Sequence, residues 1–540
     1  MTVPRRFVEV GGRQVQYRTA GDGPPVIVLH DVPGSSTQVA GIIEELAGTR
    51  RVYAPDAPGH GLSDAIPGRD EMSGFVESTV AFIDALGLGR VPLVGPGVGG
   101  LLALAAARTD PHRFPVVVDR TVRMSADRRE RLEVEGYPAF SPRLDGAHLA
   151  SVWHWVRSRF MYRAPDGRTA DDRLRMDLPS PGWLSDLAVE ILRRGPEYAG
   201  LARAALAPDP GPTLRILSEE GSVQVVEFGP PEAPGGMLAE AVAASSDLPP
   251  APPRPRQPEA RPGVISRRFV DTPQGQLHLR QSGIGGLPLL LIHQSPGSAE
   301  SLEPMISHLA PDRLVLAPDT LGNGHSDKPP VDRAGIGYYA GVLSAALDGL
   351  GIDKVDVWGS HTGALIAMEL AVRYPERVQA LGMDGITLFD PAFVEEALAN
   401  YFPPLKPDMH GLHLLRAWLI RLDMYLFWPW YNHTAAGANV RPLPDVGALK
   451  QWADDLLASG RSWRVAYRAA FEYPTRDRLP LLTRPTLLAT SPVDPLRFYS
   501  EEAAGICDAI TVAESEGYVT PEAARNTAEL YRAFFARTDR

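Results

Sequence analysis

The chain has 540 residues, which is more than one hydrophobic core organises, so the sequence predicts at least two domains. Hydrophobic residues make up 44% and charged residues 22%, as in ordinary globular proteins, and the formal net charge of −11 argues against nucleic acid or an anionic membrane surface as a partner. The single cysteine, Cys507, excludes an internal disulfide and fits a reducing compartment.

The first residues, MTVPRRFVEV, lack the apolar segment of a signal peptide. No apolar run in the sequence is long enough to span a bilayer. These two features predict a cytoplasmic protein without a membrane partner.

Blocks of the first half recur in the second half at nearly constant spacing. RRFV begins at Arg5 and again at Arg267, a shift of 262, and His148 of GAHLASVW matches His413 of GLHLLRAW at a shift of 265. The three blocks between them are VIVLHDVPGSS with LLLIHQSPGSA, YAPDAPGHGLSD with LAPDTLGNGHSD, and PLVGPGVGGLLALAA with DVWGSHTGALIAMEL. A register this steady indicates tandem duplication of a whole domain, because solenoid repeats are far shorter.

Between the copies lies a proline-dense segment, SSDLPPAPPRPRQPEARPG, at residues 245–263. Such composition favours extended polyproline II structure and predicts a semi-rigid linker. We therefore expect one domain at residues 1–244 and another at 264–540.

Each copy alternates apolar runs, such as VIVLH and VDVWG, with segments long enough to form amphipathic helices. Strands that are apolar nearly throughout, separated by helices, predict an α/β fold with a mostly parallel sheet covered on both faces.

The blocks in this order resemble the α/β-hydrolase superfamily: a strand ending in H-x-x-P-G-S, then A-P-D with a turn, then a Gly-flanked elbow, then a helical insert and two late strands. The resemblance covers nearly all the chain outside the linker. It implies two tandem α/β-hydrolase-like domains, each with a helical cap insert, at about residues 120–205 and 390–475. We expect the two copies to pack as an intramolecular pseudo-dimer, and further self-association into a homo-oligomer is compatible with the sequence.

The second copy keeps the frame of the family's nucleophile elbow but not its serine. The sequence VDVWGSHTG places His361 at the tip, between Gly359 and Gly363. In the family, the tip carries the nucleophile on a sharp strand-to-helix turn, and the next backbone N–H helps to form the oxyanion hole. The resemblance therefore implies oxyanion donors at Thr362 and in the loop that contains Gln294 and Ser295.

The rest of the family's triad also departs from its usual order of nucleophile, acid and late histidine. The last histidine of the chain, His433, lies in the predicted cap, so a Ser-His-Asp triad of standard order is excluded. Asp494 follows a late strand at the usual acid position, and Tyr518 stands where the late histidine is expected. Asp384, in LGMDGI, is a second candidate acid or else a structural carboxylate.

His361 is best suited to act as a base. The first turn of a helix disfavours imidazolium, so we expect a neutral ring that can accept a proton from water or from substrate. Ser295 is a second candidate, either as a nucleophile activated by His361 or as a residue that satisfies local turn hydrogen bonds.

The first copy has Gly97 at the tip of its elbow, which provides no attacking group. We take PTLRILSEEGS as its late strand, and no aspartate follows there. This copy is therefore predicted to be non-catalytic.

These features predict a hydrolase of a small ester, thioester or related acyl substrate, with a small molecule as its partner. Two alternatives remain: a cofactor-independent lyase or oxygenase of the same fold, and a non-catalytic pseudo-hydrolase that binds a ligand or partner. No metal motif and no dinucleotide or phosphate-binding loop is present in the sequence, so no cofactor is expected.

Overall fold

The computed structural model describes residues 3–68, 71–119, 129–130, 132–133, 136–163, 167, 169–206, 210–226, 237–244, 248–330, 334–440 and 443–538. Residues 245–247 of the predicted linker and residues 120–128 of the first predicted cap lie outside this set. The chain divides into two compact units, Met1–Pro258 with Pro407–Leu412 and Glu259–Lys406 with His413–Arg540. The division falls inside the proline-dense segment, at Pro258.

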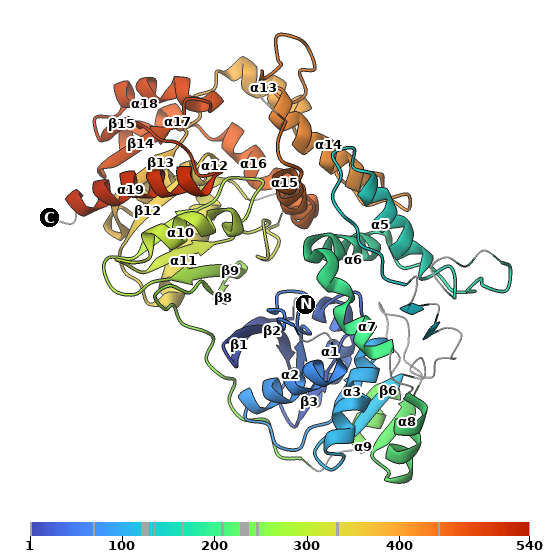
Figure 1. Ribbon diagram of the computed structural model, residues 1–540. Helices are drawn as coiled ribbons and strands as arrows, with labels where there is room; N and C mark the ends of the chain where they lie inside the picture. The colour runs from blue at the N-terminus through green and yellow to red at the C-terminus, as the bar shows by residue number, and fades with distance from the viewer. Residues whose placement is uncertain are drawn as a thin grey trace. The chain divides into compact units, whose positions relative to one another are not determined.

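The described part of the first unit contains a seven-stranded sheet in the order β1-β2-β4-β3-β5-β6-β7 (Figure 1). Strand β2 is antiparallel to β1 and β4, and the remaining pairs are parallel. The strands are β1 (Arg5–Val10), β2 (Arg13–Ala20), β3 (Pro25–Val28), β4 (Arg51–Pro55), β5 (Leu93–Gly95), β6 (Val116–Asp119) and β7 (Val223–Val226).

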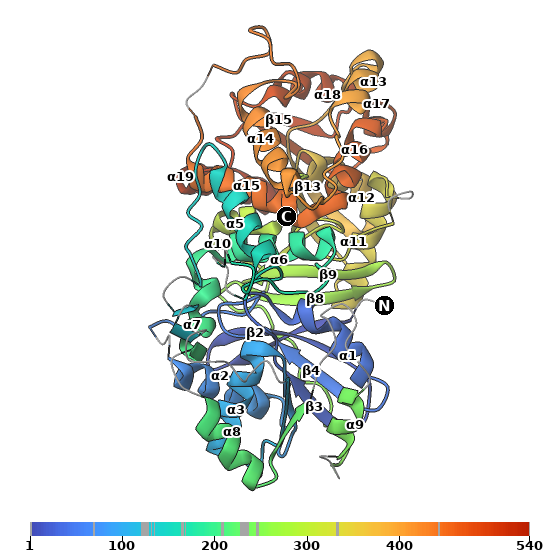
Figure 2. The same ribbon diagram turned by 90° about the vertical axis from the view of Figure 1, so that its right-hand side faces the viewer.

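Helices cover both faces of this sheet, as Figures 1 and 2 show. Alternation along β3 explains why: Val26 and Val28 point to one face, where they pack with Ile43 and Val242, and Ile27 points to the other. The helices of the unit are α1 (Ala40–Leu46), α2 (Met72–Ala85), α3 (Gly97–Thr109), α5 (Ala147–Ser158), α6 (Pro181–Arg194), α7 (Gly200–Leu206), α8 (Pro210–Glu219) and α9 (Met237–Ala244).

The second unit repeats this topology and adds one strand. Its order is β8-β9-β11-β10-β12-β13-β14-β15, with β9 antiparallel to β8 and β11 and the other pairs parallel. The strands are β8 (Ser266–Thr272), β9 (Gly275–Ser282), β10 (Leu289–Ile292), β11 (Val315–Pro318), β12 (Val355–Ser360), β13 (Val378–Asp384), β14 (Thr486–Thr490) and β15 (Ile510–Glu514). Two mixed sheets of matching order confirm the predicted pair of α/β domains.

Two hydrophobic clusters lie on the two faces of the second sheet. Helices α11 (Ile336–Leu350) and α12 (Thr362–Arg373) contribute to one, and α10 (Glu303–Leu309) and α19 (Pro521–Thr538) to the other. Helix α12 is buried on nearly all sides, with residues 364–371 at most 3% exposed. This accounts for its almost uninterrupted apolar sequence, ALIAMELA, because a helix that is apolar all round is a buried helix.

Between β13 and β14 the chain forms the helices of the second insert. These are α13 (Pro391–Asn400), α14 (Leu412–Leu426), α15 (Val446–Ser459) and α16 (Trp463–Glu472), followed by α17 (Thr475–Arg478), and α18 (Ser500–Ile506) comes after β14. Capping aspartates start two of them: Asp390 accepts a hydrogen bond from Phe393 N–H and Asp445 from Gly447 N–H. No helix in the described ranges is both long and apolar enough to cross a membrane.

One predicted strand of the first unit is wrong. The sequence PTLRILSEE forms helix α8, and the late strand is β7, at Val223–Val226. Leu214 and Leu217 are the buried residues of α8, spaced three apart on one helical face. A short run of leucine and isoleucine fits a strand or a buried helix face equally well, which is why the pattern misled.

Candidate functional site

The elbow of the second unit is built by close backbone approach. His361 links β12 to α12 with φ 50° and ψ −110°, and it is the one non-glycine residue with positive φ among the described residues. A Cβ atom at Gly359 would lie 2.2 Å from the carbonyl oxygen of Gly363, and one at Gly363 would lie 2.2 Å from that of Ile292. The flanking glycines are therefore required by space. The backbone strain at His361 costs about 1–3 kcal/mol and is retained at the tip of the turn.

The structure brings Asp494 to the His361 ring. His361 Nε2 lies 2.6 Å from Asp494 Oδ2, and the two side chains are 31% and 14% exposed. The other oxygen, Asp494 Oδ1, accepts the Leu496 N–H at 2.8 Å, which fixes the carboxylate at the start of a short helix. Because Nε2 faces the carboxylate, Nδ1 is the ring nitrogen that remains to exchange a proton with another group.

The expectation of a neutral ring is wrong for the resting protein. Burial disfavours the imidazolium, but the Asp494 carboxylate, through its charge and hydrogen bond, and the nearby Asp384 outweigh it and raise the pKa of His361 to about 9. The helix start was the only local influence visible in the sequence. A directly bonded carboxylate is stronger than the partial charge of a helix terminus.

Asp384 lies behind the elbow and does not bond the ring. Its backbone oxygen accepts the His361 N–H at 2.8 Å, and its carboxylate lies 3.4 Å from the Ser360 hydroxyl. Burial raises the pKa of Asp384 to about 7, and the Asp494 charge adds to the rise while His361 and Ser360 oppose it. The Tyr518 hydroxyl donates to Ser360 Oγ at 3.1 Å, so Tyr518 reaches this polar cluster and not the imidazole.

In the first unit, the two backbone N–H groups at the positions expected of oxyanion donors both bond one carboxylate. There, Asp31 Oδ1 accepts the Val98 N–H at 2.8 Å and the Val32 N–H at 2.9 Å. The corresponding donors of the second unit are Thr362 and Ser295 by the repeat register, and Gln294 corresponds to Asp31. The hydroxyl of Ser295 is buried without a hydrogen-bond partner among the described residues. The structure therefore shows neither the hydrogen bond to His361 expected of a nucleophile nor the hydrogen bond expected of a turn residue.

Asp31 also closes the elbow of the first unit. Gly97 has φ 48°, and a Cβ atom there would lie 2.4 Å from the Asp31 carboxylate. The first unit therefore has no attacking side chain at its tip, and its own carboxylate occupies the backbone N–H groups of Val98 and Val32. Sequence reasoning missed the role of Asp31, although the Asp31–Gln294 difference between the repeats was a visible signal.

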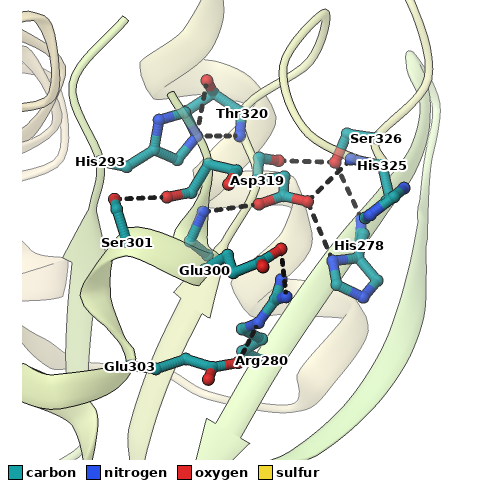
Figure 3. Close-up of polar contacts among 12 residues, drawn as sticks. His278, Arg280, His293, Glu300, Ser301, Glu303, Asp319, Thr320, His325 and Ser326 are labelled. Carbon is teal, nitrogen blue, oxygen red and sulfur yellow. Dashed lines mark hydrogen bonds and ion pairs between the residues drawn. The ribbon is translucent and has the colours of Figure 1, made fainter. Parts of the chain in front are cut away.

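A buried polar network below the loop holds its geometry (Figure 3). Asp319 accepts hydrogen bonds from His278 Nδ1 at 2.9 Å, from Ala299 N–H at 2.7 Å and from His325 N–H at 2.8 Å. His293 braces the same region, with Nδ1 2.6 Å from the Gln294 carbonyl oxygen and Nε2 accepting the Thr320 N–H at 2.9 Å. The loop that carries Gln294 and Ser295 is thus fixed at both of its ends.

Within the described residues, no group of three or more histidine, cysteine, aspartate or glutamate side chains could hold a metal ion.

Comparison with known proteins gives several partial matches. A 2-hydroxymuconate semialdehyde hydrolase of Pseudomonas sp. (strain CF600) is 33% identical over 135 residues, which covers 22% of this chain and 47% of that protein. A haloalkane dehalogenase of Mesorhizobium japonicum is 35% identical over 111 residues, covering 20% of this chain and 36% of that protein. The chain spans between a third and a half of the length of these curated relatives.

Two solved structures each align with about half of the chain. An enol-lactonase from Burkholderia xenovorans LB400 aligns with 50% of this chain and 99% of its own, at 18% identity and a TM-score of 0.39. An esterase from Thermogutta terrifontis aligns with 51% of this chain and 99% of its own, at 20% identity and a TM-score of 0.39.

The family model described as the alpha/beta hydrolase fold matches residues 24–140 and 288–518. The two matched segments together span more than half of the chain, and they fall on the two sheets described above. The chain therefore belongs to the α/β-hydrolase fold family, with the fold present twice.

Proposed function

We propose that the second unit is a hydrolase of a small ester, thioester or related acyl substrate, with His361 as its general base. The observation that supports this most is the 2.6 Å contact between His361 Nε2 and Asp494 at the tip of a strained elbow, next to the backbone donors of Thr362 and Ser295. An imidazole oriented by a carboxylate beside preorganised N–H groups is the arrangement that activates water toward a carbonyl.

In this proposal Nδ1 of His361 accepts a proton from water as the water oxygen attacks the substrate carbonyl carbon. Asp494 holds the ring and stabilises the imidazolium that forms. The N–H groups of Thr362 and Ser295 hydrogen-bond the developing oxyanion. The proton on His361 then passes to the leaving alkoxide or thiolate, which restores the neutral base.

Substitution of His361 tests the assignment. We expect p-nitrophenyl ester or acyl thioester turnover to fall by about 10² or more in His361→Ala, the usual range for loss of a general base. Asp31→Asn in the first unit is the matched control and should keep wild-type turnover. Unchanged turnover in His361→Ala would falsify the assignment.

A second candidate, a cofactor-independent lyase or oxygenase, is favoured by one observation. The raised pKa of His361, about 9, also suits a ring that exchanges protons with a substrate carbon or oxygen. Incorporation of ¹⁸O from labelled water into the product separates the two: hydrolysis requires it, and a lyase or an oxygenase that uses O₂ does not produce it.

The third candidate is a pseudo-hydrolase that binds a ligand without reaction. It is favoured by the first unit, where Gly97 and Asp31 leave no attacking group and no open donor pair. For the second unit it predicts ligand-induced thermal stabilisation with no product, and any reaction that depends on His361 would exclude it.

A further inference from the structure

The insert of the second unit contains a buried cation. Arg421, on α14, is 8% exposed. Its Nη1 donates to Met424 Sδ at 3.3 Å, its guanidinium carbon lies 5.8 Å from the centre of the Trp452 ring, and its Nε is buried without an acceptor among the described residues. Sulfur is a weak acceptor, and a guanidinium removed from water is costly unless charge-assisted hydrogen bonds satisfy it.

Two phenols share this environment. The hydroxyls of Tyr401 and Tyr467 lie 3.0 Å apart, and both rings contact Phe471. Burial raises the pKa of both hydroxyls, and the nearby Arg421 charge opposes that rise, so both remain protonated donors at neutral pH. Burial also lowers the pKa of Arg421, although Tyr467, Asp455 and Tyr401 partly offset it, which shows that the chain compensates the charge incompletely.

This cluster lies toward the catalytic dyad. Tyr467 stands on α16, which packs against α12, the helix that begins next to His361. The Asp494 charge raises the pKa of the Tyr467 hydroxyl and the Arg421 charge lowers it, so both charged groups act on this hydroxyl. Phe471, one turn further along α16, also lines an open groove of about 430 Å³ with Phe389.

The first unit provides an internal comparison. Its insert also carries a guanidinium near the elbow, Arg159, which donates to the Val32 carbonyl oxygen at 3.1 Å and lies 5.0 Å from the Trp155 ring centre. Burial lowers the pKa of Arg159, but Tyr137 and the Asp31 carboxylate raise it, and the net shift is upward. At the position of Asp31 the second unit has the neutral Gln294, and the carboxylate that acts on Arg421 there is Asp455.

We propose that Arg421, with the Tyr401 and Tyr467 hydroxyls, binds the carboxylate of an organic acid substrate whose apolar body lies among the aromatic side chains around Phe471. This inference rests on the proposed function, because it names the substrate class of the same site. A carboxylate accepts two hydrogen bonds from one guanidinium, and phenol hydroxyls add further donors. The scissile carbonyl of such a substrate would then lie between this subsite and the donors of Thr362 and Ser295.

Binding of benzoate and of its neutral counterpart benzamide to the full-length chain tests the proposal by calorimetry. We expect benzoate to bind about tenfold or more tightly than benzamide, and Arg421→Met to lower benzoate affinity by about tenfold or more without changing benzamide affinity. Arg159→Met is the matched control and should leave benzoate binding unchanged. His361→Ala should also bind benzoate, because the subsite does not include the base. If this variant loses turnover and keeps benzoate binding, both proposals are supported. If the wild-type protein binds benzoate through Arg421 but turns over no ester, only the hydrolase assignment is overturned.

Two further variants keep the test decisive if Arg421→Met fails to fold. Tyr467→Phe and Tyr401→Phe each remove one donor and preserve the ring, and each should weaken benzoate binding several-fold. Equal binding of benzoate and benzamide, or benzoate affinity unchanged in both tyrosine variants, would overturn the carboxylate subsite and leave Arg421 as a packing residue on Trp452.

Discussion

His361 owes its charge to a carboxylate that lies 133 positions further along the chain. The ring sits at a helix start, which disfavours imidazolium, yet Asp494 makes it the favoured form below pH 9. If the ring works as a base, its active form is the minority form at neutral pH. The dependence of rate on pH therefore reports directly on the role of His361.

We expect kcat/KM to rise about tenfold per pH unit toward a plateau near pH 9, because the deprotonated fraction of His361 grows in that range. Asp494→Asn removes the charge that raises this pKa, so the inflection should move to lower pH, by about one unit or more, while the plateau falls. Rate measurements between pH 6 and 10 on both proteins check this. A rate that falls as pH rises through 9 would instead make the ring an acid.

The sequence pointed to His361 through the Gly-flanked elbow frame and to Asp494 through its place after a late strand of the second copy. It did not indicate the protonation of the ring, since that depends on a distance of 2.6 Å between two segments far apart in the chain. The same limit applies to Arg421, which in the sequence is one arginine on an amphipathic helix. Its burial beside two phenols appears only after the insert folds.

His278 is a second residue whose charge depends on folding. It is fully buried against Asp319, and burial lowers its pKa to about 4 although the Asp319 hydrogen bond opposes the change. The unfolded chain, with an ordinary pKa near 6.5, binds more protons between those values. His278 therefore favours folding above pH 6.5, and this contribution is lost as pH falls toward 4.

The free energy of unfolding of the second unit should fall by up to about 3 kcal/mol between pH 7 and 4 through this residue. His278→Gln should flatten that dependence, and glutamine is a suitable replacement because Gln16 stands at the equivalent buried position of the first unit. Urea denaturation at several pH values measures it. An equally steep pH dependence in the variant would assign the effect to groups other than His278. Asp319 is not one of them, because its folded pKa lies well below its ordinary value and its contribution to stability is lost only below about pH 4.

The strand-turn-helix elbow occurs in both units with a different residue at its tip. Both turns take a positive φ at the tip, 48° at Gly97 and 50° at His361. In the second unit a side chain is accommodated there and pairs with Asp494. In the first unit the Asp31 carboxylate lies where a Cβ atom of residue 97 would be. Glycine is therefore required at this position both by the positive φ and by the lack of space for a side chain.

Gly97→Ala should destabilise the first unit by about 1–3 kcal/mol, because it places a Cβ in a left-handed conformation and 2.4 Å from Asp31. Gly89→Ala is a matched control, since a Cβ there meets nothing within 4 Å. Adding Asp31→Ala to Gly97→Ala should recover part of the loss if the two positions are coupled. Equal effects of the two glycine variants in urea denaturation would contradict this account.

The strands and helices around the elbow could be predicted where the spacing of apolar residues fits only one kind of element. The apolar run VDVWG and the helix-length ALIAMELA form β12 and α12 as expected, because flanking glycines mark the turn between them. PTLRILSEE was assigned to a strand and forms α8, because its few apolar residues fit both periods. The true strand, β7, has only four residues.

At the scale of the whole molecule, one fold occurs twice with different side chains next to the backbone N–H groups that follow the elbow tip and the third strand. The repeat register predicted the duplication, and the matching strand orders confirm it. The first unit contains a carboxylate at its donors, and the second contains none at the equivalent Gln294. A chain of this design should bind one external carboxylate although it has two α/β-hydrolase folds.

Calorimetric titration with benzoate should therefore give a stoichiometry near one per wild-type chain. Asp31→Ala frees the Val98 and Val32 N–H groups and removes the carboxylate near Arg159, so this variant should bind up to two. The double variant Asp31→Ala with Arg421→Met should again bind one benzoate per chain, now at the first unit. Its ester turnover should equal that of the single variant Arg421→Met. A stoichiometry of two in the wild-type chain would show that Asp31 does not occupy the donors in solution, and the two units would then have to be regarded as equivalent binding sites.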